Sequence, residues 1–285
     1  MAGHFFPPLS PVSQLFRLLL QPQLNNEYKM MKCNLTGAVL VSAVLLTASC
    51  ATRHYQMTGI DRTRVLVDQR YDQQPDAEAA RLLAPYTHTV DSIMSPIVGE
   101  TTHYMSARRP ESDLSNLLGD ILVWGGEQRG DHPDFGLYNM GGIRASLPEG
   151  KVTYGDLVDV APFDNKLCLL TLTGEKTLQL FREIASVGGE GVSHGVELVI
   201  TKDGKLVSAR INGKEIDPAK SYRVATLDYL AQGNDRLEAF LSKTDVVSPD
   251  VEENNVRYII RHYFEEMTRQ GKKIDTQKEG RIVIE

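Results

Sequence analysis

Two short stretches near the middle of the chain carry side chains suited to holding a small polar ligand. The first is the loop N-M-G-G-I-R, in which Gly141 and Gly142 lack a Cβ, so a ligand can come close to the main chain. Asn139 and Arg144 stand at its two ends and offer an amide and a planar cation, which suits a phosphate or a carboxylate. The pattern predicts a binding loop.

The second stretch, P-F-D-N, begins eighteen residues after Arg144. Phe163 offers a flat apolar face for a base, and Asn165 offers an amide that both donates and accepts hydrogen bonds. Further along, A-T-L-D-Y-L-A-Q-G-N-D adds the ring of Tyr229 and the carboxylate of Asp235. Two rings, a cation, amides and a carboxylate together predict a nucleotide site.

In this order and at this spacing, the three stretches resemble the C-terminal, substrate-binding domain of the 5'-nucleotidase family. The tetrapeptide E-G-R-I at residues 279–282 completes the likeness, which runs from about Val98 to the end of the chain. In that family, two aromatic rings clamp the base, an Asp holds the ribose, and Asn and Arg side chains hold the base and phosphate regions. The resemblance implies a nucleotide or nucleoside as the binding partner.

Carried onto this chain, the resemblance implies a base between Phe163 and Tyr229 and a ribose on Asp235. It also implies a phosphate contact from an Arg before the helix that starts at Ser112, for which Arg109 is the candidate. The resemblance also implies contacts to the nucleotide from three further side chains, those of Asn139, Arg144 and Asn165. A glycine-rich loop after residue 187 is implied to contact the nucleotide too, with Gly189 as the candidate.

The sequence departs from the family pattern at four positions. Met140 stands where the family has a third Gly, and Tyr229 stands where it has Phe. Asn234 and Arg236 replace glycines on either side of the Asp. A Tyr still stacks on a base, whereas Met140 narrows the loop and Arg236 restricts the turn.

Alternating strands and helices are expected to position these residues. Apolar runs of strand length at 135–138, 167–172 and 222–227 each lie next to a site segment. Asp-Gly between 197–200 and 206–211 predicts a hairpin. The fold class is therefore α+β, a mixed sheet flanked by helices, and the helix after Ser112 has an apolar stripe of Leu114, Leu117, Leu118, Ile121 and Leu122.

Residues 96–285 are expected to form this domain, and residues 51–95 a tether with a helical segment. A short alternating run at 65–67 predicts a first strand or an extended arm. Pro85 lacks the N–H that a continuous helix needs, so a kink or two short helices are expected there. The apolar residues of this segment recur at helical spacing: Ala79, Leu82, Leu83, Tyr86, Val90 and Ile93.

Residues 31–50 resemble a bacterial lipoprotein signal peptide. Lys32 opens a basic region, residues 35–48 are mostly apolar, and small residues precede Cys50, which would carry the lipid. The chain is thus expected to be extracytoplasmic and anchored to a membrane through Cys50. A spanning anchor is the alternative, although the run is shorter than the roughly 20 residues that a spanning helix needs. Residues 1–30 then precede the signal and suggest an early start site.

Net charge argues against nucleic acid as a partner. The formal charge is −6, and broad nucleic-acid binding depends on a basic face. Of three cysteines, Cys33 leaves with the signal and Cys50 is acylated, so Cys168 has no partner for a disulfide.

Complete 5'-nucleotidases also carry a metallophosphatase domain with D-x-H, G-D-x-x-D and G-N-H-[DE] metal motifs, and none of these occurs here. The stretch before Val98 is too short for such a domain. We therefore expect no cofactor in this chain, and divalent metals on a separate metallophosphatase chain that hydrolyses the bound nucleotide. The alternatives are a surface protein that captures nucleotides for uptake or sensing, and a scaffold whose site has decayed.

Overall fold

The computed structural model of the chain describes residues 56–70, 73 and 75–285. The expected signal peptide, the lipidation of Cys50 and the early start site lie outside the described residues. The chain divides into two units, Met1–Arg70 and Tyr71–Glu285. In the described part of the first unit, residues 56–70 form neither helix nor strand, so of the two alternatives for residues 65–67 the strand is wrong and the extended arm stays a prediction. Val65 and Val67 are exposed, and the described residues of this unit include no strand with which they could pair.

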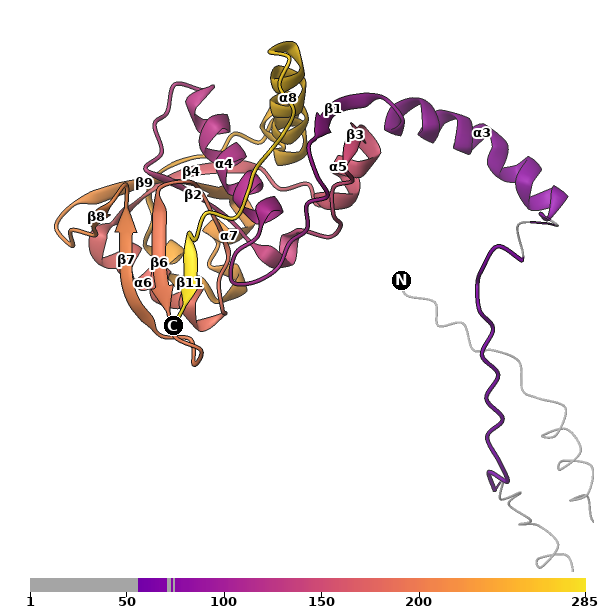
Figure 1. Cartoon of the computed structure of the whole chain (residues 1–285), viewed down its shortest axis with the longest axis horizontal. Helices are drawn as coiled ribbons and strands as arrows, with labels where there is room; N and C mark the ends of the chain where they lie inside the picture. Colours follow the sequence, from indigo (N-terminus) through magenta and orange to yellow (C-terminus); the bar gives the residue numbers. More distant parts are fainter. Residues whose placement is uncertain (1–55, 71–72, 74) are drawn as a thin grey trace, which may run out of the picture. The chain divides into compact units, whose positions relative to one another are not determined.

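A five-stranded sheet forms the centre of the second unit, in the order β10-β4-β9-β2-β5 (Figure 1). Strand β2 (Phe135–Tyr138) runs parallel to β9 (Ser221–Leu227), and β9 runs antiparallel to β4 (Leu167–Thr173). Strands β10 (Thr244–Val247) and β5 (Gly191–Val192) close the two edges with antiparallel pairs. The predicted mixed sheet is confirmed.

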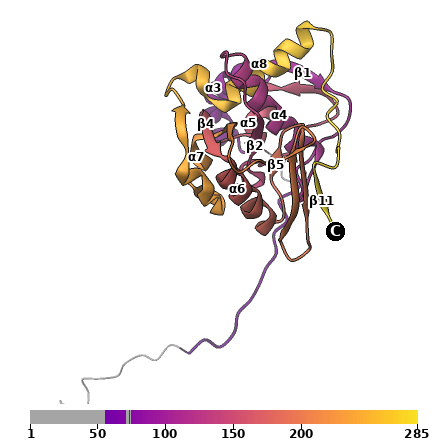
Figure 2. The ribbon, with the colours of Figure 1, turned by 90° about the vertical axis from the view of Figure 1, so that its left-hand side faces the viewer.

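Helices cover both faces of this sheet. Phe135 contacts Phe181 of α6 (Gly174–Ser186), with 5.4 Å between ring centroids. Its neighbour Gly136 lies against the backbone of α4 (Asp113–Glu127), where a Cβ would overlap a helix carbonyl. Because successive residues of a strand point to opposite faces, α4 and α6 must cover opposite sides of the sheet, as the two views show (Figures 1 and 2).

Helix α4 begins where the sequence predicts. The Ser112 side chain accepts a hydrogen bond from the backbone N–H of Ser115, and Ser115 bonds back to Ser112. Such a reciprocal cap satisfies N–H groups that the first helical turn leaves without partners. The helix packs on β2 and on α8 (Val256–Arg269), and its predicted apolar stripe is fully buried: Leu114, Leu117, Leu118, Ile121 and Leu122.

A second sheet of four strands has the order β11-β6-β7-β8. Strands β6 (Val196–Ile200) and β7 (Leu206–Ile211) form the predicted hairpin, and β8 (Lys214–Glu215) extends it. Strand β11 (Ile282–Ile284) joins parallel to β6. Near α5 (Tyr154–Val160), β1 (Ile97–Thr101) and β3 (Gly150–Thr153) form a small ribbon.

The E-G-R-I motif fastens β11 to α4. Arg281 is almost completely buried and donates to both carboxylate oxygens of Asp120, each at 2.8 Å, and to the carbonyl of Val192. Glu111, also buried, accepts the backbone N–H groups of Glu279 and Gly280. The motif therefore serves the fold and lies outside the hollow described below.

Helix α3 (Ala77–Met94) is one continuous helix, so the alternative of two short helices is wrong. Asp76 caps its first turn, and the helix continues past Pro85, which lacks one backbone N–H donor. No residue of α3 is buried. Of the helices that the structure describes, none combines the length and apolarity needed to cross a membrane.

Candidate functional site

A hollow of about 300 Å³ opens at one edge of the central sheet. The carboxyl ends of the parallel strands β2 and β9 meet at this edge, and the antiparallel β4 begins there. Ligands of α/β sheets commonly bind at such an edge, where chain segments diverge and leave a crevice. The hollow is lined by Asn139, Gly141, Gly142, Arg144, Phe163, Asn165, Tyr229 and Asp235.

Eight residues were predicted to bind the ligand, and six of them line this hollow. Arg109 and Gly189 do not. The rings of Phe163 and Tyr229 remain partly open to solvent, at 47% and 38% exposure. Within the described residues, these two rings make no contact with each other. They therefore face one cavity from different loops and leave space between them.

Asp235 is held from two sides. Its Oδ1 accepts a hydrogen bond from the Tyr229 hydroxyl at 2.9 Å, and its Oδ2 accepts one from Asn139 Nδ2 at 2.6 Å. The bond to Asp235 raises the pKa of the Tyr229 phenol, so the phenol keeps its proton and acts as the donor. A carboxylate has about four acceptor positions. Asp235 thus retains acceptor capacity for a ligand.

The turn that carries Asp235 adopts left-handed backbone angles. Gly233 has φ +83°, Asp235 has φ +56° and Arg236 has φ +65°. Arg236 thus adopts a left-handed conformation that a Gly would take without steric cost, and it does so at a cost on the order of 1 kcal/mol. The departure strains the turn but does not displace Asp235 from the hollow.

The Gly loop after β2 is a short 3-10 turn, Met140–Gly142. A Cβ on Gly142 would lie 2.5 Å from Asn139 Oδ1, so this position cannot hold a larger residue without moving Asn139. Arg144 donates to the Gly141 carbonyl at 3.2 Å. In the described part of the chain this is the one side-chain hydrogen bond of Arg144, which leaves other guanidinium donors for an anion.

Arg257 of α8 fixes the loop that presents Phe163. Its guanidinium donates to the carbonyls of Ala161 and Pro162, at 3.1 and 3.0 Å, and to the carboxylate of Asp164 at 2.9 Å. The loop itself follows α5 directly. Sequence reasoning missed Arg257 because it lies over ninety residues after the loop and no local motif links them.

Arg109 and Gly189 lie outside the hollow, and each contacts another part of the protein. Arg109 pairs with the buried carboxylate of Glu190, which also accepts the backbone N–H of Met140. Burial raises the pKa of Glu190. Gly189 has φ +109° and lies against the backbone of Pro110, where a Cβ would overlap. Sequence reasoning also missed Glu190, which next to a run of glycines carries no distinctive signal.

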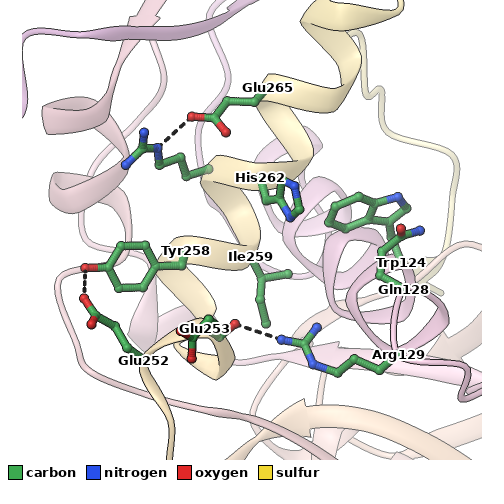
Figure 3. Close-up of a pocket in the computed structure, with 10 residues that line it drawn as sticks. Trp124, Gln128, Arg129, Glu252, Glu253, Tyr258, Ile259, His262 and Glu265 are labelled. Carbon is green, nitrogen blue, oxygen red and sulfur yellow. Dashed lines mark hydrogen bonds and ion pairs between the residues drawn. The ribbon is translucent and has the colours of Figure 1, made fainter.

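Another hollow lies between α4 and α8 (Figure 3). Tyr258 donates to Glu252 at 2.7 Å, and Arg261 pairs with Glu265 at 2.7 Å. Arg129 donates to the carbonyl of Glu253 at 2.9 Å. Most of the charged side chains of this hollow therefore already have partners, whereas Arg144 in the sheet-edge hollow pairs with no carboxylate among the described residues. Among the described residues, no group of three or more His, Cys, Asp or Glu could hold a metal ion.

Curated relatives match a large part of the chain. Protein UshA of Escherichia coli is 28% identical over 157 residues, which cover 54% of this chain and 28% of the relative. Endonuclease YhcR of Bacillus subtilis is 28% identical over 258 residues, covering 87% of this chain and 20% of the relative. The chain thus spans between a fifth and a third of these relatives' length.

Solved structures share the fold. The 5'-nucleotidase precursor from Thermus thermophilus superposes with a TM-score of 0.63 at 25% identity, over 73% of this chain and 43% of the other. The NAD nucleotidase of Haemophilus influenzae gives 0.53 at 20% identity, over 73% and 41%.

A family model described as "5'-nucleotidase, C-terminal domain" matches residues 97–242. That span contains the Gly loop, the Phe163 loop, Tyr229 and Asp235, which are the segments around the sheet-edge hollow. The chain belongs to the 5'-nucleotidase C-terminal domain family.

Proposed function

We propose that the chain binds a nucleotide or nucleoside in the hollow at the sheet edge. The observation that carries this proposal is that three loops, separate in sequence, place two open rings, a held carboxylate and an arginine around one cavity. Each group alone is common on protein surfaces. Their convergence in a chain of the 5'-nucleotidase C-terminal domain family supports nucleotide recognition.

The chemistry of the lining suggests how the ligand would sit. The base would stack between Phe163 and Tyr229, with roughly 1–3 kcal/mol per stacked base. Asp235 would accept hydrogen bonds from the ribose hydroxyls. Arg144 would pair with phosphate, and Asn165 would bond to a polar edge of the base.

Hydrolysis is proposed to require a separate metallophosphatase chain that carries the divalent metals. Two metals in such an enzyme activate water and stabilise the phosphoryl oxygens. Two of the similar proteins are named 5'-nucleotidase, and the chain spans less than half of each, so the rest of those proteins has no counterpart in the match. In this proposal the present chain holds the substrate and its partner performs the chemistry. The setting would be extracytoplasmic nucleotide catabolism, with a lipid on Cys50 as the membrane anchor.

Calorimetry with AMP and adenosine tests the binding step. The expected result is saturable heat with the wild type and much weaker binding with Phe163→Ala; Val207→Ala, an exposed apolar residue on β7, is the control. Absence of heat with either ligand would favour a decayed scaffold.

Hydrolysis of 5'-AMP with divalent metal tests the second step, with the chain alone and with a candidate metallophosphatase. Turnover only in the mixture is expected. Robust turnover by the chain alone would overturn the two-chain proposal. Binding of AMP with no turnover in any mixture would favour a protein that captures nucleotides for uptake or sensing.

A further inference from the structure

Helix α3, drawn at the start of the second unit in Figure 1, has large apolar side chains on one face, and none of its residues is buried. Four large apolar residues on this face are each more than half exposed: Leu83 55%, Tyr86 66%, Val90 51% and Ile93 52%. Leu82 beside them is 68% exposed. Solvated helices seldom leave so many large apolar side chains in one row without a partner.

The spacing of this row is that of a helix–helix seam. Ala79, Leu83, Tyr86, Val90 and Ile93 follow one another at intervals of four, three, four and three residues. This alternation is the heptad pattern, in which positions a and d of one helix pack against another helix. A period of 3.5 suits a straight helical partner better than the flat face of a sheet.

Charged side chains avoid both the seam and its borders. The charged or titratable residues of α3 are Glu78, Arg81, His88 and Asp91, all at outer positions b, c or f. The positions that border the seam hold only uncharged residues: Ala80, Leu82, Thr87, Thr89 and Met94. In coiled coils, charges at these border positions select partners by attraction or repulsion.

We propose that α3 is a dimerisation surface that docks against α3 of a second copy of this chain. With no charge at the border positions, two identical helices meet without like-charge contacts, which a self-complementary two-fold interface requires. Dimerisation through α3 would not require the proposed nucleotide binding.

A membrane surface fits this helix less well. Interfacial helices carry a polar face rich in Lys and Arg, which anionic lipids attract. The polar face of α3 has a single Arg, at 81, against Glu78 and Asp91, and Asp76 caps the helix. Charge complementarity therefore favours a neutral helix as the partner.

The available area predicts a weak dimer. If the apolar row loses most of its remaining exposure, each copy buries on the order of 500 Å², so the pair reaches the roughly 1,000 Å² at which specific interfaces begin. Two heptads are also fewer than the three or four that stable coiled coils use. The dimer should dissociate on dilution within the micromolar range.

Sedimentation equilibrium of the full chain, over a micromolar concentration series, tests this proposal. The seam variant is Leu83→Ala with Val90→Ala, because Ala removes apolar bulk and is the best helix former, so α3 persists. The matched control is Arg81→Ala with His88→Ala on the outer face. Because all three proteins share the same remaining chain, association through other segments affects them equally.

The expected result is a concentration-dependent dimer for the wild type and the control. The seam variant should raise the dimer dissociation constant by about a hundredfold or more, since two buried side chains are lost from each copy. Wild type that stays monomeric at all concentrations would overturn the proposal, as would equal association of seam variant and control. A monomer that binds phosphatidylglycerol vesicles through the seam residues would assign the face to a membrane instead.

Discussion

The Tyr229 hydroxyl donates a hydrogen bond to Asp235 Oδ1 at 2.9 Å. One residue supplies a ring to the hollow and the other supplies a carboxylate, so the bond joins two lining groups of the hollow into one unit. A Phe, which the resemblance to the family leads one to expect at this position, could not make this bond. The Tyr229 hydroxyl therefore tethers the ring and places a phenol beside the proposed ribose position.

Replacing Tyr229 separates stacking from tethering. Tyr229→Ala should weaken AMP binding by roughly 1–3 kcal/mol, because one face of the base loses its ring. Tyr229→Phe keeps the ring and should change affinity only a few-fold. Calorimetry of both variants makes the comparison, with Val207→Ala as the control. Wild-type affinity in Tyr229→Ala would show that this ring does not contact the base.

Asp235→Asn should act on the sugar and not on the base. The variant loses the negative charge, and hydrogen bonds to a charged acceptor are about twice as strong as neutral ones. We expect adenosine to bind about tenfold or more weakly, with free adenine unaffected. Parallel calorimetry with adenosine and adenine provides the measurement. An equal loss of affinity for both ligands would mean that the substitution disturbs the loop and that Asp235 does not bind the ribose.

Arg257→Ala should loosen the Phe163 loop. The variant leaves the carbonyls of Ala161 and Pro162 without their donor, and it should lower the free energy of unfolding by about 2–3 kcal/mol. AMP affinity should fall as well, since Phe163 is no longer held. Arg257→Lys keeps the positive charge but lacks the planar guanidinium that donates to several acceptors at once, so this variant should retain only part of the wild-type AMP affinity.

The control for Arg257 is Arg261→Ala, on the same helix. Arg261 is exposed, bonds to Glu265 four residues away and lies 5.3 Å from the ring centroid of Tyr154, so its loss should cost about 1 kcal/mol, less than the loss of Arg257. Chemical denaturation measures both variants. Equal, small effects at the two positions would contradict the role of Arg257 as a positioning residue.

Arg236→Gly should stabilise the protein. Arg236 has φ +65°, a left-handed conformation that Gly adopts without steric cost, and the gain should be roughly 0.5–1 kcal/mol. Arg236→Ala, which keeps the Cβ, should give no such gain. Thermal melting compares the variants. A loss of stability in Arg236→Gly would show that the Arg side chain contributes contacts worth more than the backbone strain.

The ion pair between Asp131 and Arg223 should make stability depend on acid pH. Arg223 donates to both Asp131 oxygens and holds the pKa of that carboxyl below its usual 3.8. Because the folded-state pKa is depressed, the stabilisation is present above the unfolded-state pKa and is lost as pH falls through the folded value. Asp131→Asn should cost about 1–2 kcal/mol near neutral pH and progressively less below about pH 4. A constant difference at all pH values would argue against the ion pair.

Local patterns in the sequence were sufficient for much of the fold. The apolar runs at β2, β4 and β9, and the capped stripe of α4, encode their own geometry, because strand and helix periods are properties of neighbouring residues. The glycines and rings of the site stand directly after such elements. For that reason the residues that line the hollow could be named in advance.

Only the tertiary structure showed which distant residues fix the loops that line the hollow. Arg257 meets the Phe163 loop, and Glu190 meets the Gly loop and Arg109, through contacts that no local period encodes. The same limit explains α3: its spacing predicts a buried face, yet the structure leaves that face exposed. The spacing of apolar residues in the sequence indicates that one face of a helix is suited to burial, whereas only the folded chain shows whether another element packs on that face.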